Sequence, residues 1–166
     1  MMQSSGLVPP TLRPPAGLGE AYLRLSLADT VPALLRMKQV QEVLVLPAAR
    51  LTPIPNLPPL VLGLMNRRSR VLWVVDLPQL LGLPPLDAGR QSHALAIIQV
   101  ASGSLALAVH QVDGMGWLSE DEIQPPPPHL PSHLMPFLRG CVLQAQHIAL
   151  VLDPEAIVHA PALLNH

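Results

Sequence analysis

The sequence predicts an all-β fold, mainly strands with a few short helices, arranged as two small barrels packed together. The chain has 166 residues and is 49% hydrophobic, yet 21 residues are proline, and each interior proline costs a helix about 3 kcal/mol or more. The apolar residues are Leu, Val, Ile and Ala in short runs separated by proline and glycine, as is typical of strands and turns. Finally, one strand–turn–strand–helix unit occurs twice, and a unit of this size needs a neighbour to bury its apolar face.

Composition limits the classes of function and the location. The formal net charge of −1, from 10 basic and 11 acidic residues, provides no overall positive field to hold nucleic acid. The single cysteine, Cys141, cannot form an internal disulfide and fits a reducing compartment. The first nineteen residues lack the pattern of a signal peptide, and no apolar run reaches the roughly 18 residues that span a bilayer. We therefore expect a cytoplasmic protein that neither inserts into a membrane nor binds nucleic acid.

The expected domain boundaries follow from the distribution of proline and glycine. Residues 1–19 contain four prolines and three glycines and are expected to form a flexible tail. Residues 20–160 are expected to form a single domain made of the two barrels, and residues 161–166 a short C-terminal tail.

The first strands are predicted from alternation and from proline. The stretch "YLRLSL", residues 22–27, alternates strictly between apolar and polar positions and predicts a half-buried strand. "QVQEVLVLP", residues 39–47, predicts a second strand with Glu42 facing outward. Prolines recur through residues 50–60, which predicts an edge or connecting segment.

The next segment reads as a hairpin followed by a short helix. Residues 63–67 and 71–76 predict two strands around a turn at "RSR". Asp76 precedes "LPQLLGL" and predicts an N-cap, and Gly82 ends the short helix.

This unit recurs further along the chain. Gly63 and Asp76 have counterparts in Gly140 and Asp153, each 77 positions later. At the same offset apolar positions align: Met65 with Val142, Val71 with Ile148, Val74 with Val151, Val75 with Leu152, Leu80 with Ile157, and Leu81 with Val158. The same local structure is therefore predicted twice, once in each barrel.

Three further segments complete the prediction. "HALAIIQV" and "LALAVHQV", residues 93–100 and 105–112, flank "ASGS" and predict a second kind of hairpin. "SEDE", residues 119–122, predicts a capping box. The run "QPPPPHLP", residues 124–131, predicts extended, polyproline-like surface chain.

The sequence carries no motif that argues for an enzyme or a cofactor. His129 and His133 have i, i+4 spacing, but the prolines around them exclude the helix that would bring them together, so no metal site is predicted. A hydrolase using Cys141 and His147 with Asp153 is a weaker alternative, because Asp153 is explained as a helix cap. Cys141 is interpreted as a small core residue.

The positive turn of the first hairpin is the strongest candidate for binding. Arg67, Arg68 and Arg70 lie within four positions, whereas the second hairpin has Gln144, Ala145 and His147 in their places. The fold therefore does not demand arginine here, and a positive spot on a near-neutral chain suggests a partner with a complementary acidic spot. The alternative is a barrel module that binds a peptide or nucleic acid through the turn at residues 67–70.

An ordered set of motifs resembles the CheW family of bacterial chemosensory adaptors. The motifs are "YLRLSL", "VQEV" (residues 40–43), "PIPNLPP" (53–59), "GLMNRRS" (63–69), "VVDL" (74–77), "LALAVHQVDGM", "IQPPP" and "FLRGCVLQAQHIALVLDPEAIV". The resemblance implies two five-stranded SH3-like barrels and a non-enzymatic adaptor, recruited to membrane receptor arrays, that joins a CheA-like histidine kinase to methyl-accepting receptors. In the family, one face contacts the kinase and the groove between the barrels takes the receptor tip. The segment "MNRRSRVLWVVDLPQLLGL" is similar to cyanobacterial CheW-like proteins of phototaxis and pilus motility.

The resemblance also implies partner-binding residues. They are Val40, Glu42, Asn66 and Arg68. Ser69 stands where the family has glycine, so the turn geometry is expected to differ. Arg67 and Arg70 lie outside the family pattern and are interpreted as local solvation or rim charge. The predicted output is chemotaxis, phototaxis or pilus control.

Overall fold

The computed structural model describes residues 19–144 and 146–164. Its strands form two five-stranded sheets, which confirms the predicted all-β class. In order across the sheet, the first contains β8 (Gln111–Leu118), β1 (Glu20–Ala28), β2 (Val31–Arg36), β10 (His147–Leu152) and β9 (Leu138–Gln144). The second contains β3 (Val40–Pro47), β6 (Ser92–Val100), β7 (Gly103–Val109), β5 (Arg70–Asp76) and β4 (Val61–Arg67).

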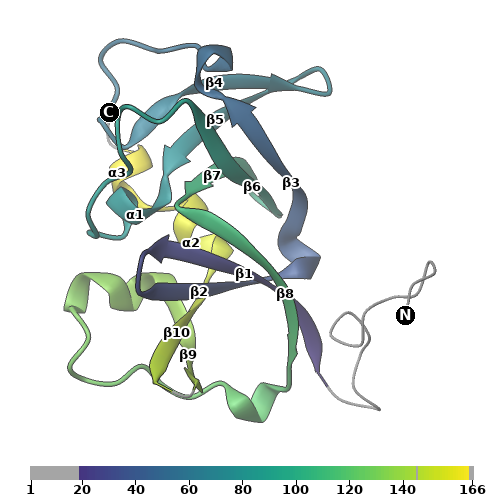
Figure 1. Ribbon diagram of the computed structural model, residues 1–166, viewed down its shortest axis with the longest axis vertical. Helices are drawn as coiled ribbons and strands as arrows, with labels where there is room; N and C mark the ends of the chain where they lie inside the picture. The colour runs from purple at the N-terminus through teal and green to yellow at the C-terminus, as the bar shows by residue number, and fades with distance from the viewer. Residues whose placement is uncertain (1–18, 145, 165–166) are drawn as a thin grey trace.

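Each sheet curls and closes on itself through one isolated bridge. Thr52, after β3, pairs with Leu64 of β4, and Gln124, after β8, pairs with Cys141 of β9. We call the first sheet barrel A and the second barrel B. Figure 1 shows barrel B above barrel A, with the short helices gathered between them. The helices are α1 (Leu77–Leu80), α2 (Pro154–Val158) and α3 (Pro161–Leu164), and the 3₁₀ turns are Met37–Gln39, Ala48–Arg50, Glu120–Glu122 and Ser132–Phe137.

The predicted repeat is present in three dimensions. In each barrel a hairpin, β4–β5 or β9–β10, pairs in parallel with a third strand, β7 or β2. Asp76 Oδ1 accepts a hydrogen bond from the backbone N–H of Gln79 at 2.9 Å, and Asp153 Oδ1 accepts from Glu155 N–H at 3.0 Å. Both aspartates are therefore the N-caps that the sequence predicts.

The strand order also shows how the repeat is distributed. Barrel B takes all its strands from one continuous segment, β3 to β7, whereas barrel A combines β1 and β2 with β8 to β10. The orders β3-β6-β7-β5-β4 and β8-β1-β2-β10-β9 match strand for strand. Each half of the sequence, β1 to β5 or β6 to β10, contributes five strands. The last three strands of each half form a barrel with the first two strands of the other half.

One apolar core joins the two barrels. The largest cluster of buried residues includes Leu25 of β1, Ile98 of β6, Leu77 of α1 and Ile157 of α2. Smaller clusters fill the interiors of barrel B, around Val74, and barrel A. Because both barrels and the helices contribute to one cluster, burial of apolar surface holds the barrels together.

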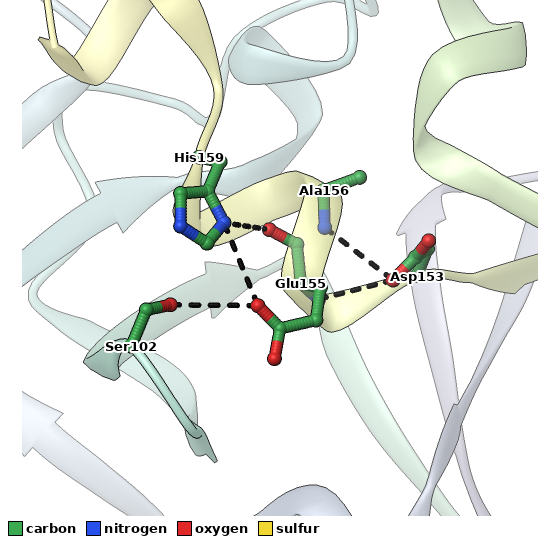
Figure 2. A network of polar contacts seen from close by, with 5 residues as sticks. All are labelled: Ser102, Asp153, Glu155, Ala156 and His159. Carbon is green, nitrogen blue, oxygen red and sulfur yellow. Dashed lines mark hydrogen bonds and ion pairs between the residues drawn. The ribbon is translucent and has the colours of Figure 1, made fainter.

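A polar network reinforces this junction (Figure 2). Glu155, on α2 after the last strand of barrel A, accepts a hydrogen bond from Ser102 in the β6–β7 turn of barrel B at 3.4 Å. The Nδ1 atom of His159 lies 3.5 Å from the same carboxylate. The network connects α2, which follows barrel A, to the β6–β7 turn of barrel B.

Two local predictions differ from the structure. The predicted strand at 105–112 breaks at His110, where the chain leaves β7 in barrel B and enters β8 in barrel A. His110 N–H donates to Ser26 O at 3.0 Å, and Arg90 donates to the His110 carbonyl at 3.2 Å, which fixes the crossing. The sequence interpretation also missed β2, because this central strand is apolar on both faces and does not alternate.

Other predicted segments have these outcomes. The strands at 22–27, 39–47, 63–67, 71–76 and 93–100, the helix after Asp76 and the capping box at 119–122 are present. Residues 1–18 of the predicted flexible tail lie outside the described residues. Within the stretch predicted as a C-terminal tail, residues 161–164 form α3, and Leu163 is buried in the shared core.

Candidate functional site

The turn of the β4–β5 hairpin is a two-residue turn with an unusual backbone. Arg67 pairs with Arg70, and the central residues Arg68 and Ser69 have φ angles of 52° and 64°. Two successive positive φ angles define a type I′ turn, which favours Asn and Gly because other side chains are strained there. Ser69 thus adopts the left-handed conformation that glycine would adopt more cheaply, and the side chain of Arg68 is 77% exposed.

Glu42 of β3 is the centre of a charged cluster beside this turn. Arg67 donates from Nε to Oε1 at 3.1 Å and from Nη2 to Oε2, so that its planar guanidinium holds both carboxylate oxygens. Arg68 Nε lies 3.5 Å from Oε1 of the same carboxylate. Only 18% of the Glu42 side chain is exposed, whereas its neighbours on β3, Gln41 and Val43, are exposed. The prediction that Glu42 faces outward was wrong. One half-buried carboxylate therefore serves two arginines from the neighbouring hairpin.

The ionisation of the cluster follows from this pairing. The hydrogen bonds from Arg67, with the charges of Arg67 and Arg68, lower the pKa of Glu42. The same hydrogen bond raises the pKa of Arg67. Glu42 is therefore ionised at neutral pH. Arg67 binds both oxygens of its carboxylate, whereas Arg68 pairs with one oxygen and remains largely exposed.

A hollow beside the cluster completes the site. It has a volume of about 250 Å³, and the apolar side chains of Leu72 and Ile97 line it together with Glu42 and the arginines. Arg70 also lines it and donates from Nη2 to Ser104 Oγ at 2.9 Å. Three guanidinium groups and one carboxylate at this end of barrel B leave an excess of positive charge facing solvent.

The structure brings together two of the four predicted partner-binding residues. Glu42 and Arg68 lie in the cluster. Asn66 is exposed on the other face of β4, opposite Val71, because successive strand residues point to opposite sides. Val40 is half-buried at the start of β3, before a bulge, and packs against the core that joins the barrels. The four residues therefore do not form one contiguous surface.

Arg67 and Arg70, which the sequence interpretation treated as local solvation or rim charge, have specific partners in the structure. Arg67 is the main partner of Glu42, and Arg70 is tied to Ser104. Alternation along β4 was the available signal, because it places Arg67 on the same face as the buried Met65.

A second surface lies where the barrels meet. Val43 and Val45 project from the outer face of β3, and Val45 is 67% exposed. A hollow of about 310 Å³ is lined by these two residues, by Val112 of β8, and by Arg90 and His110. It is a shallow apolar groove between β3 and β8 with basic groups at its edge.

The geometry does not support the hydrolase alternative. Cys141 is buried, and burial raises the pKa of its thiol, which disfavours the nucleophilic thiolate. Cys141 pairs with Leu150 in the β9–β10 hairpin, and alternation from Leu150 places exposed His147 on the opposite face of the sheet. Asp153 is engaged in capping α2.

The described residues contain neither a cluster of metal-binding side chains nor a helix that could cross a membrane. Within residues 19–144 and 146–164, no three His, Cys, Asp or Glu side chains lie together in a way that could hold a metal ion. None of the helices in this part of the chain combines the length and the apolarity that a bilayer crossing requires.

Comparisons with known proteins agree on one family and one fold. The family model described as "CheW-like domain" matches residues 21–162. "Chemotaxis protein CheW" of Rhizobium meliloti is 33% identical over 60% of this chain, and the match spans 64% of that relative's length. "Protein PilI" of Pseudomonas aeruginosa is 33% identical over 78% of this chain, and the match spans 70% of the PilI chain. The crystal structure of the scaffolding protein TtCheW from Thermoanaerobacter tengcongensis superposes with a TM-score of 0.71 and 22% identity, covering 82% of this chain and 90% of that one.

Proposed function

Because this chain belongs to the CheW-like domain family, we propose that it joins methyl-accepting receptors to a CheA-like histidine kinase through two separate surfaces. The chain is a CheW-like scaffold of chemotaxis or pilus signalling, and its family and fold are those of non-catalytic scaffold proteins. The coupling of receptor to kinase, the location in the cytoplasm and the recruitment to membrane receptor arrays are parts of the proposal.

The observation that carries the proposal is the presence of two different surfaces on opposite faces of one strand, β3. The charged cluster of Glu42, Arg67 and Arg68 lies at the end of barrel B, on the inward face of β3. The apolar groove with Val43 and Val45 lies on the outward face of the same strand. A bridging protein needs two such surfaces, whereas a simple binding module needs only one.

We assign the groove to the receptor tip and the charged cluster to the kinase. A helix binds a shallow groove through a row of apolar side chains, and Val43, Val45 and Val112 provide matching apolar contacts. At the cluster, Arg68 pairs with Glu42 through Nε, but 77% of its side chain is exposed. Its guanidinium can therefore also meet an acidic group of the partner, which would fix orientation more than it adds affinity.

The experiment is an affinity pull-down of the tagged chain from its source cells, read for a histidine kinase and a methyl-accepting receptor. Arg68→Glu is expected to lose the kinase while retaining the receptor, and Val45→Glu the reverse. Neither variant is expected to change the melting temperature by more than about 2 °C, because both side chains are largely exposed.

Arg139→Glu provides the matched control, because it reverses the charge of an exposed arginine on β9 of barrel A. It is expected to retain both partners. If Arg68→Glu and Val45→Glu both retained both partners, the two-surface assignment would be rejected. Capture of neither protein by the unmodified chain would reject the bridging function.

The alternative of a barrel that binds a peptide or nucleic acid through the turn at residues 67–70 is not favoured. Arg67 and Arg68 both pair with Glu42, and Arg70 donates to Ser104, so each of the three arginines already has a partner within the chain.

A further inference from the structure

A second hollow of barrel B lies away from the charged cluster, next to the cap of α1. Its volume is about 470 Å³, and it contains none of the residues assigned above to either partner. Leu51, Leu62 and Leu86 line it and also pack against the interior of barrel B. Most of the lining is apolar, and its polar residues are Asp76, Gln79, Asp87 and His93. Asp87 is exposed and accepts a hydrogen bond from Gly89 N–H.

His93 is the unusual group in this hollow. It is the second residue of β6, and alternation places it on the same inward face as Leu95 and Ile97. The residue is only 8% exposed, and its Nδ1 atom is buried without a hydrogen-bond partner among the described residues. Burial, with a contribution from Arg90, lowers the pKa of His93, so the ring is neutral at physiological pH.

The neighbouring charged groups are already committed. Asp76 accepts from Gln79 N–H at Oδ1 and from Leu86 N–H at Oδ2, each at 2.9 Å. Arg90 donates to the carbonyl oxygens of Ser92 and His110. Arg90 lines the groove between β3 and β8 and not this hollow, and none of these contacts involves the imidazole.

The tautomer of His93 follows from its surroundings. A neutral imidazole carries one N–H, and an orphaned buried donor is rarer in proteins than an under-satisfied acceptor. The proton therefore belongs on Nε2, which is not among the buried unpartnered atoms, while the lone pair occupies the enclosed Nδ1. His93 thus offers one hydrogen-bond donor in a mainly apolar hollow.

The corresponding place in barrel A shows that the fold does not require this arrangement. Glu20 pairs with Leu118 in β1–β8 as His93 pairs with Leu46 in β6–β3. Glu20 Oε2 lies 3.2 Å from Arg36 Nε in an ion pair, although neither atom makes a hydrogen bond. In barrel B no described side chain plays this part for His93.

We propose that this hollow binds a small, neutral, mainly apolar molecule whose single acceptor oxygen takes the Nε2–H of His93. Apolar walls with one placed polar group are typical of small-molecule sites. The site is separate from both partner surfaces, so its occupant would act as a ligand of the scaffold and would not compete with the kinase or the receptor.

Cyclohexanone is the probe, because it has one acceptor oxygen, no donor and a compact apolar ring. The full chain, labelled with ¹⁵N, is titrated and followed through the imidazole nitrogens of His93 and the amides of Leu86 and Gln79. The expected result is a saturable shift at these three residues. Methylenecyclohexane, in which CH₂ replaces the oxygen, is expected to bind about tenfold more weakly, since one hydrogen bond is lost.

Two variants test the role of the imidazole. His93→Leu is expected to bind both compounds with equal affinity, and His93→Gln, which keeps a donor, to retain a preference for the ketone. Dispersed amide spectra identify variants that remain folded. The proposal is overturned if cyclohexanone causes no saturable shift up to its solubility limit, or if folded His93→Leu retains the preference. Because no kinase or receptor enters the titration, failure here leaves the bridging function unaffected.

Discussion

The related ends of the two barrels have the same strand order and different chemistry. In barrel B, Glu42 of β3 pairs with Ile97 of β6, and Arg67 from the hairpin holds its carboxylate. In barrel A the matching strands pair Gly114 with Arg24, and Gln144 stands 77 positions after Arg67. The hollows there are similar in volume, about 250 and 240 Å³. Two copies of one architecture thus differ in whether they contain an internal carboxylate.

What the copies share identifies the requirements of the fold. Gly63 and Gly140 are both crossed by a backbone carbonyl, and Asp76 and Asp153 both cap a helix. Glu42 and the arginines of the first turn have no counterparts in barrel A, so the fold does not require them. Gly63, Gly140, Asp76 and Asp153 are therefore structural residues, whereas Glu42 and the arginines are candidates for binding.

The largest effect is expected from the shared glycines. A Cβ at Gly63 would lie 2.7 Å from Thr52 O, and one at Gly140 would lie 2.6 Å from Gln124 O. Gly63→Ala and Gly140→Ala should each lower the free energy of unfolding by about 3 kcal/mol in urea titrations, because backbone must move in both cases. Tolerance of alanine at one site alone would break the proposed equivalence of the barrels.

A smaller effect, of opposite sign, is expected from the turn that differs. Ser69→Gly should raise the free energy of unfolding by about 1 kcal/mol, because glycine reaches a φ of 64° without steric cost. Thermal melting measures the change. Ser132→Gly is the control, since Ser132 is exposed and is not among the described residues with a positive φ, so glycine offers no relief there. Equal changes in the two variants would contradict the strain assigned to the turn.

The smallest effect is the pH dependence of the Glu42 ion pair. The pKa of Glu42 is lowered in the folded protein. The ion pair therefore stabilises the fold fully at pH values above the pKa of Glu42 in the unfolded chain, about 4.3. This contribution is lost as the pH falls from that value through the lower folded pKa. NMR titration of the side-chain carboxyl should give a pKa nearer the ordinary value in Arg67→Ala. An identical titration curve in Arg67→Ala and the unmodified chain would remove Arg67 as the cause.

The repeat was predictable from the sequence because its requirements are local. Gly63 and Asp76, with their counterparts 77 positions later, act through turns, caps and close contacts within a few residues or one strand pair. The exchange of strands between the halves was not predictable, because it depends on which strand is neighbour to which. His110 marks the crossing from β7 to β8 but has no turn signature in the sequence.

The candidate site was predictable only in part. Glu42 and Arg68 follow from the resemblance to a family, and the structure places them together. Arg67 forms the main hydrogen bonds to Glu42. The sequence did not predict this pair, because it depends on the tertiary contact between β3 and the β4–β5 hairpin. The sequence did not identify His93 as a candidate, because a histidine in an apolar strand is typical of a core position. Only the structure shows that its Nδ1 atom lacks a hydrogen-bond partner among the described residues.

The exchange of strands also has a consequence for the order of folding during synthesis. Barrel B is continuous from β3 to β7 and can close as soon as β7 leaves the ribosome, whereas β1 and β2 must wait for β10. During this interval β2 lacks its parallel partner, and its buried side chains Ala33, Leu34 and Leu35 remain uncovered. The first strands to be made are therefore among the last to be covered. Slow translation between residues 110 and 147 would prolong a state with an open, apolar sheet edge, which is where chaperone binding or aggregation would begin.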